Sequence, residues 1–160
     1  MKKIAIIAAF ALVAGCATTE ETATIDTTEP VMEKVGYEAG SQQDLEANAG
    51  HRVFFGYDQY GLSPQAQAIL RKQADWLNAN PGVAVRLAGS ADERGTREYN
   101  LALGARRAEA TRAYLVSLGV PANRLETISH GKERPIAQGA NESAWAQNRN
   151  STTTVMSVAG

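Results

Sequence analysis

The sequence predicts a two-layer α/β sandwich with a mixed sheet, built in the order βαβαβ(α)β. Three observations support this fold class. Runs rich in β-forming residues alternate with amphipathic helical runs from Arg52 onward, the two main helical runs are long enough to cross between strands, and Gly or Pro follows both of them. We expect a disordered linker to precede this domain.

The first half of the domain is expected to supply two strands and one helix. Arg52 to Phe55 is rich in β-forming residues, and Gly56-Tyr57-Asp58 follows it as a turn. Ser63-Pro64 offers a helix N-cap with proline at the first helical position. Apolar residues then recur at spacings of three and four until Asn80-Pro81-Gly82. The alternation in Val83 to Ala88 predicts the second strand.

The second half is expected to supply a long helix, two strands and a short helix. The long helix is predicted from about Glu98 to Leu118, before the C-terminal stop at Gly119-Val120-Pro121. Its inner stripe is predicted to contain Leu101, Gly104, Ala108, Thr111, Leu115 and Leu118. The remaining predicted elements are a strand over Leu125 to His130, a helix over Asn141 to Gln147 and a strand over Thr152 to Val158.

Residues 1–15 are predicted to be a lipoprotein signal peptide. Two lysines precede the apolar run Ile4 to Ala14, which is shorter than the roughly 20 residues that span a bilayer but fits a secretory signal. The ending Val13-Ala14-Gly15-Cys16 resembles the lipobox of bacterial lipoproteins, whose cysteine is acylated. Several acyl chains on Cys16 would anchor stably, and Ala17 after it favours the outer membrane. The alternative is an ordinary signal peptide that ends near a cysteine.

Residues 16–50 are expected to form the lipidated N-terminus and a disordered acidic linker. From residue 17 to residue 50 there is one Lys against eight Asp and Glu, and large apolar residues are few. Such a segment cannot bury enough surface to offset its ordering entropy. A short helix within Ser41 to Ala49 is compatible with the sequence, but nothing in the sequence anchors it. The net charge of −1 argues against binding of nucleic acid.

The stretch from Ala88 to Ala108 predicts a binding site at a strand-to-helix junction. Asp92 lies in the loop, and Asn100 and Arg107 lie on the helix that follows it. At about 100° per residue these two positions differ by only about 20°, and Leu103 lies on the same side. Because this line begins beside the loop, Asp92 and Arg107 form a matched pair of charges for a zwitterionic ligand.

Other residues near this stretch have two interpretations. Three further loop charges are either solvated or orient Asp92: Glu93, Arg94 and Arg97. Tyr57 and Tyr99 are equally compatible with the site and with packing, whereas packing is favoured for both tryptophans, Trp76 and Trp145. His130 has no Cys or second His near it, so we expect no metal ion and no cofactor.

Four motifs resemble those of the OmpA-like C-terminal domain family and, within it, the peptidoglycan-associated lipoproteins of the Tol-Pal system. They are ADERGTREYNLALGARRA, FFGYDQY, SHGKERP over Ser129 to Pro135, and Asn148-Arg149. The resemblance extends from about His51 to Val158, and the order of lipobox, linker and domain agrees with it. It implies an OmpA-like peptidoglycan-binding domain over residues 51–160 and no enzymatic activity.

The resemblance also implies the ligand, which is diaminopimelate in the stem peptide of peptidoglycan. Asp92 would accept hydrogen bonds from its ammonium, and Arg107 would donate two parallel bonds to its carboxylate. Leu103 would pack against the methylene chain, and backbone N–H groups near Thr96 would add donors. The implied ligand-binding residues are Asp92, Arg107, Leu103, Asn100, Thr96 and Asp58. We expect Asp92→Ala or Arg107→Ala to abolish binding to sacculi while leaving the fold intact.

The cellular role implied by the resemblance is a tether. An outer-membrane lipoprotein, anchored through lipid on Cys16, would hold its periplasmic domain on the cell wall. The implied partners are peptidoglycan, a TolB-like β-propeller protein and a TolA-type protein that act during envelope constriction and cell division. Three residues depart from the family pattern: Gly56 replaces the usual Asp, Ser90 a frequent His and Asn150 a second Arg.

Two other classes of function agree less well with the sequence. A peptidoglycan hydrolase would use Asp92 and Glu93 as acid and base, but the nearby arginines would lower the pKa that a catalytic acid must have raised. A motor stator would keep a spanning helix, and a barrel porin would have many amphipathic strands upstream. This chain shows neither feature.

Overall fold

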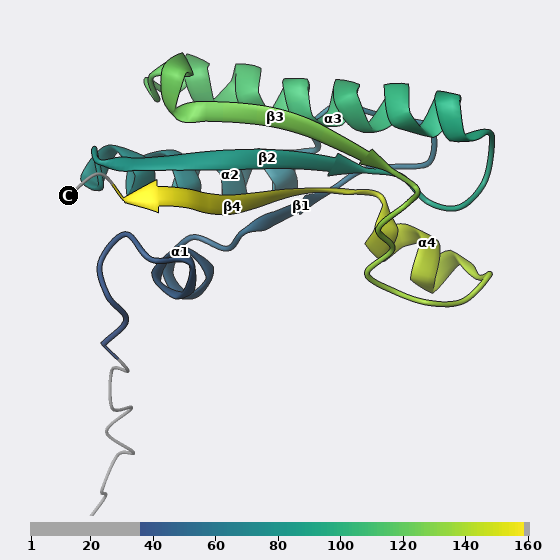
Figure 1. Cartoon of the computed structure of the whole chain (residues 1–160), viewed down its shortest axis with the longest axis horizontal. Coiled ribbons are helices and arrows are strands. Elements are labelled where there is room, and N and C mark those ends of the chain that lie inside the picture. The colour runs from purple at the N-terminus through teal and green to yellow at the C-terminus, as the bar shows by residue number, and fades with distance from the viewer. Residues whose placement is uncertain (1–35, 159–160) are drawn as a thin grey trace, which may run out of the picture. The chain divides into compact units, whose positions relative to one another are not determined.

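The computed structural model describes residues 36–158 and confirms the predicted α/β class (Figure 1). The predicted signal peptide, Cys16 and the predicted linker up to residue 35 lie outside the described residues. The elements are α1 (Gln42–Asn48), β1 (Arg52–Phe54), α2 (Pro64–Ala79), β2 (Val83–Ser90), α3 (Arg97–Ser117), the 3-10 turn η1 (Ala122–Arg124), β3 (Leu125–Gly131), α4 (Glu142–Asn148) and β4 (Asn150–Val158).

The four strands form one mixed sheet in the order β1-β4-β2-β3, as the alternating pattern of strands and helices predicts. Strand β2 pairs parallel to β3 and antiparallel to β4, and β1 pairs antiparallel to β4. Helix α3 is the crossover between the two parallel strands. The loop that enters α3 therefore lies at the C-terminal end of β2, where sheets of this kind bind ligands.

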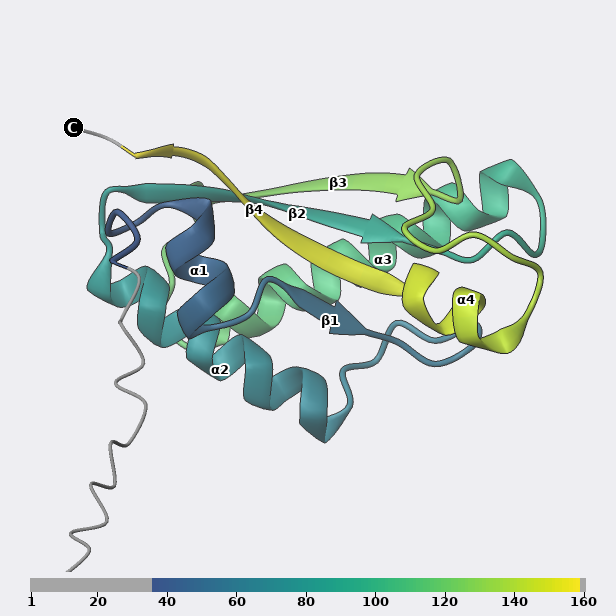
Figure 2. The same cartoon turned by 90° about the horizontal axis from the view of Figure 1, so that it is seen from below.

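Helices α2 and α3 pack side by side against the sheet (Figures 1 and 2). Val83, Val85 and Leu87 alternate along β2 and are fully buried in the main hydrophobic core. The intervening Arg86 is exposed and pairs with Glu126 of β3. One face of β2 thus carries the core, as its period of two predicts.

Helix α3 lies unusually close to the end of β2. A Cβ atom on Gly89 would collide with the main-chain carbonyl of Gly104, and one on Gly104 would collide with the Ser129 hydroxyl. The prediction that Leu101 belongs to the inner stripe is wrong, because this side chain is half exposed. Leu103 is buried in its place, since the close approach at Gly104 sets the rotation of the helix.

Helix α1 is anchored to the domain, so the expectation that nothing anchors it is wrong. Ser41 caps it, and Leu45 is fully buried in the main core. The indole of Trp76 donates to Asp44 at 2.9 Å, and Gln42 accepts from the main-chain N–H of Val155 at 2.8 Å. The linker therefore ends before this helix and not at residue 50. Between residues 36 and 158, no helix is both long enough and apolar enough to cross a membrane.

Candidate functional site

The loop between β2 and α3 is held at both ends. Ala91 donates its N–H to the carbonyl of Gly131 at 2.7 Å, which keeps the loop start beside β3. Thr96 is the N-cap of α3 and accepts from the N–H of Tyr99 at 3.2 Å. The side-chain amide of Asn100 donates to the carbonyl of Arg94 at 2.8 Å, so the helix itself fastens the loop.

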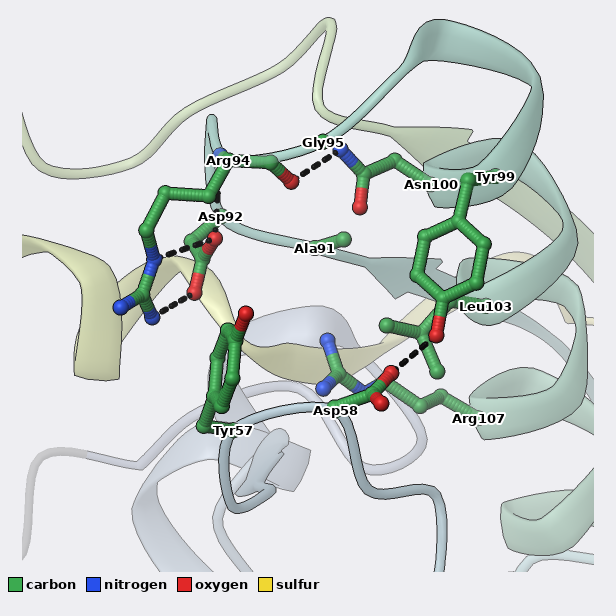
Figure 3. A pocket seen from close by; sticks show the side chains of 10 residues that line it. All are labelled: Tyr57, Asp58, Ala91, Asp92, Arg94, Gly95, Tyr99, Asn100, Leu103 and Arg107. Atoms are coloured by element: carbon green, nitrogen blue, oxygen red, sulfur yellow. Dashed lines mark hydrogen bonds and ion pairs between the residues drawn. The ribbon is translucent and has the colours of Figure 1, made fainter.

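A cavity of about 240 Å³ lies between this loop, α3 and the segment that follows β1 (Figure 3). It is lined by Tyr57, Asp58, Ala91, Asp92, Arg94, Gly95, Tyr99, Asn100, Leu103 and Arg107. Its volume lies below the usual range for small-molecule pockets, so it suits the end of one side chain. Five of the six predicted ligand-binding residues line it. The sixth, Thr96, does not line the cavity and is instead the N-cap of α3.

Arg107 is fully buried beneath the cavity and holds three main-chain carbonyls together. Its Nε donates to Gln59 at 2.8 Å, and its two terminal nitrogens donate to Ser90 at 2.8 Å and to Gly56 at 3.1 Å. Burial lowers the pKa of its guanidinium to about 10, although the charge of Asp92 opposes this shift. Arg107 therefore remains a cation at neutral pH and joins α3 to β2 and to the segment after β1.

Arg107 also retains donors for a ligand. A guanidinium has five N–H groups, and within residues 36–158 three of them bind the carbonyls described above. Each terminal nitrogen keeps one further N–H, and Figure 3 shows the guanidinium reaching into the cavity. Two donors on neighbouring nitrogens suit a carboxylate that binds in a bidentate manner.

Asp92 is also buried, and it is paired with two other arginines. Its carboxylate accepts from Arg94 Nε at 3.1 Å and Nη2 at 2.6 Å, and from Arg149 at 3.4 Å. Burial alone would raise the pKa of Asp92, but the hydrogen bonds and charge of Arg94, together with Arg149, lower it below its ordinary value. Asp92 is therefore an anion at neutral pH.

Asp58 forms the opposite rim of the cavity with Tyr99. Its carboxylate accepts a short hydrogen bond from the Tyr99 hydroxyl, and Figure 3 shows the two side chains meeting across the cavity mouth. The φ angle of Asp58 is 55°, a left-handed conformation that few residues other than glycine adopt. Asp tolerates this conformation better than most residues do, and the turn holds its carboxylate beside Tyr99 at the cavity.

Arg94 is an ordered part of the site, so its interpretation as a solvated charge is wrong. Its guanidinium lies between two aromatic rings, 4.2 Å from the centroid of Tyr57 and 4.0 Å from that of Trp145. Trp145 also donates its indole N–H to Glu93 at 2.9 Å. Arg97 is the first residue of α3, where it is exposed and pairs with Glu133, as a solvated charge is expected to do. A hint in the sequence was the i+2 spacing of Arg94 from Asp92.

Helix α4 and its C-cap residue, Arg149, bring to the site two residues that the prediction did not include. Glu142 accepts from Arg149 at 2.6 Å and lies 4.0 Å from Arg94. Arg149 is nearly buried and also donates to the carbonyl of Phe55 at 3.1 Å. These two arginines and two carboxylates form a network behind the cavity. No local pattern predicts it, because Arg149 lies 57 positions from Asp92 in the chain.

Two of the departures from the family pattern touch Arg107 through the main chain. The acceptors are the carbonyl oxygens of Gly56 and Ser90, so neither bond depends on the side chain at those positions. Asn150 is buried and donates to the carbonyls of Gln147 and Asn148, behind the cavity. The residue types at positions 56 and 90 therefore do not prevent the hydrogen bonds that Arg107 donates there.

The electrostatics of the site favour binding over acid catalysis. A general acid needs a raised pKa, whereas the two arginines beside Asp92 lower its pKa. The cavity instead is lined by an anion from the loop, Asp92, and by a cation from α3, Arg107, with Leu103 of the same helix as an apolar surface. This arrangement is complementary to a small zwitterion.

The chain is similar to several known proteins. The model of the OmpA family matches residues 54–149. A peptidoglycan-associated lipoprotein of Rhizobium meliloti is 57% identical over 114 residues, which are 71% of this chain and 65% of that protein. A peptidoglycan-associated lipoprotein of Pseudomonas putida is 42% identical over 154 residues, which are 92% of both chains.

A solved structure shows the same fold. The crystal structure of the peptidoglycan-associated lipoprotein from Burkholderia pseudomallei has a TM-score of 0.65 and 44% sequence identity, and the match covers 66% of this chain and 90% of that one. The family model spans more than half of the 160 residues, and the Pseudomonas relative aligns over nearly its full length. The chain therefore belongs to the OmpA family, alongside the peptidoglycan-associated lipoproteins.

Proposed function

We propose that this protein binds peptidoglycan non-covalently through diaminopimelate of the stem peptide. The observation that carries the proposal is the pairing of two buried, opposite charges in one small cavity. Arg107 lines this cavity as a cation, and Asp92 lines it as an anion. The names of the relatives support peptidoglycan as the ligand.

Diaminopimelate fits this cavity for a chemical reason. The end of its side chain carries an ammonium and a carboxylate on the same carbon, at the tip of a short methylene chain. The carboxylate pairs with Arg107, the ammonium with Asp92, and the methylene groups with Leu103. Hydrogen bonds to charged groups contribute roughly 1.5–3 kcal/mol each, so two or three account for much of a micromolar affinity, near 8 kcal/mol.

The wider proposal is a tether between the outer membrane and the cell wall. Lipid on Cys16 anchors the protein in the outer membrane, the acidic segment after it provides reach, and the domain binds the wall in the periplasm. We place the protein in the Tol-Pal system, with a TolB-like β-propeller protein and a TolA-type protein as partners. The lipid anchor is supported by the lipobox and by the names of the relatives, and the partners are proposed from the resemblance of the motifs to lipoproteins of the Tol-Pal system.

Competition on purified sacculi tests the ligand. We expect the protein to sediment with diaminopimelate-type sacculi and to be released by millimolar free meso-diaminopimelate. Cadaverine lacks both carboxylates of diaminopimelate, and pimelate lacks both amines, so each is expected to release less protein at the same concentration. Retention that none of the three compounds reduces would show that the ligand is a different part of the wall.

Replacement of the lipobox cysteine tests the anchor. In the Cys16→Ser variant no thiol is available for acylation, so we expect the protein in the soluble periplasmic fraction. Membrane fractionation and metabolic labelling with palmitate measure the outcome. A Cys16→Ser variant that stays in the outer membrane with the wild-type yield would contradict lipid anchoring at this residue.

A further inference from the structure

The carboxylate of Asp92 is fully occupied by donors of the protein itself. One oxygen accepts from the main-chain N–H of Arg94 at 3.1 Å and from its Nε at 3.1 Å. The other accepts from Arg94 Nη2 at 2.6 Å and from Arg149 at 3.4 Å. A carboxylate offers about four lone-pair positions, so an incoming ammonium has to displace one of these donors.

The side chain of Arg94 is the donor that is best able to leave. Arg149 is only 8% exposed, and it is held by the carbonyl of Phe55 as well as by Glu142. Arg94 is 31% exposed and projects from a loop at the rim of the cavity (Figure 3). Its main-chain N–H stays bound to Asp92 when the side chain rotates, so the loop keeps its shape.

A second acidic partner lies within reach of the displaced guanidinium. Glu142 is 4.0 Å from Arg94 Nη2, and its side chain is 65% exposed. A rotation toward Glu142 keeps the cation beside a carboxylate and next to the ring of Trp145, which already contacts it at 4.0 Å. The charge of Arg94 therefore does not have to be left without a partner when its bond to Asp92 breaks.

We propose that the Arg94 guanidinium is an internal occupant of the ammonium position, which the ligand's own ammonium displaces from Asp92. This proposal rests on the proposed function, and it assigns to Arg94 the role of an affinity- and specificity-determining residue. Competition by an internal group reduces the apparent affinity by the fraction of molecules in the open state. It also selects for ligands that carry a cation, because only a cation replaces the positive charge of Arg94 beside Asp92.

Replacing Arg94 with Met tests the proposal directly. Methionine keeps an unbranched chain between the two aromatic rings but removes the competing cation. If the bond between the Arg94 side chain and Asp92 is formed in about nine-tenths of the molecules, Arg94→Met is expected to bind free meso-diaminopimelate about tenfold more tightly. Calorimetry measures this affinity. The matched control is Arg97→Met, which removes the same charge three positions later, at the exposed first residue of α3, and is expected to bind as the wild type does.

The fluorescence of Trp145 reports the displacement independently. Its ring lies against the Arg94 guanidinium, so movement of that group changes the surroundings of the indole. We expect meso-diaminopimelate to change the emission of the wild type, and this change to disappear in Trp145→Phe, which keeps Trp76 as the remaining tryptophan. Pimelate, which has no ammonium, is expected to produce no change at the same concentration.

The outcomes separate this proposal from the one on which it rests. Tighter binding by Arg94→Met together with the emission change supports the displacement. Unchanged or weaker binding by Arg94→Met, or wild-type binding without any change in Trp145 emission, overturns the displacement but leaves peptidoglycan binding in place. Absence of binding by the wild type in calorimetry and on sacculi overturns both proposals.

Discussion

Replacing Arg107 with Ala is expected to lower the free energy of unfolding by about 4 kcal/mol and to abolish binding to sacculi. The fully buried side chain joins the carbonyls of Gly56, Gln59 and Ser90, and each buried acceptor left without a donor costs about 1–3 kcal/mol. The structure therefore changes the expectation that this variant keeps an intact fold. Arg107 both binds the ligand and stabilises the walls of the cavity.

Urea unfolding and sedimentation with sacculi measure the two effects of Arg107→Ala. Arg106→Ala is the matched control, because the neighbouring side chain is exposed on the same helix and lies over the ring of Tyr60. Arg107→Lys separates charge from geometry, since one ammonium cannot serve three carbonyls and a carboxylate. We expect it to fold with reduced stability and to lose most binding. Wild-type stability in Arg107→Ala would contradict the structural role.

Replacing Asp92 with Asn is expected to weaken binding of meso-diaminopimelate by about a hundredfold, equivalent to about 2.7 kcal/mol. The amide keeps the shape of the carboxylate but removes the charge that attracts the ammonium, and it brings an N–H toward Arg94 and Arg149. Calorimetry measures the loss. Glu98→Gln makes the same charge change at an exposed position of α3 and is expected to leave binding unchanged.

The same variant tests the protonation state of Asp92. The pKa of its carboxyl in the folded protein lies below the model value of 3.8, so its ionised form stabilises the fold at every pH above 3.8. This stabilisation decreases as the pH falls from 3.8 to below the pKa that Asp92 has in the folded protein. Unfolding curves of the wild type and of Asp92→Asn should therefore differ at neutral pH and converge in strong acid. A constant difference across this range would contradict a lowered pKa.

Local patterns predicted most of the scaffold of the site. The period of two in Val83 to Ala88 and the cap at Ser63 each correspond to an element found within one or two residues of its expected position. Helix α1 and Leu101 were the failures. Leu45 is anchored by a core built from distant residues, and Leu101 is exposed because the contact between Gly89 and Gly104 sets the rotation of α3. Neither cause is local in sequence.

The sequence by itself determined the class of the fold, the strand-to-helix junction and the choice of Asp92 and Arg107 as its charged residues. Helical and strand periods, caps and residue chemistry act over a few positions, so they can be read directly from the chain. Only the tertiary structure decided which partners these charges have. Arg107 binds main-chain carbonyls, and Asp92 binds Arg94 and an arginine 57 positions away. Burial forces each charge to find partners wherever the fold supplies them, and for Asp92 those partners occupy the position that a ligand's ammonium would take.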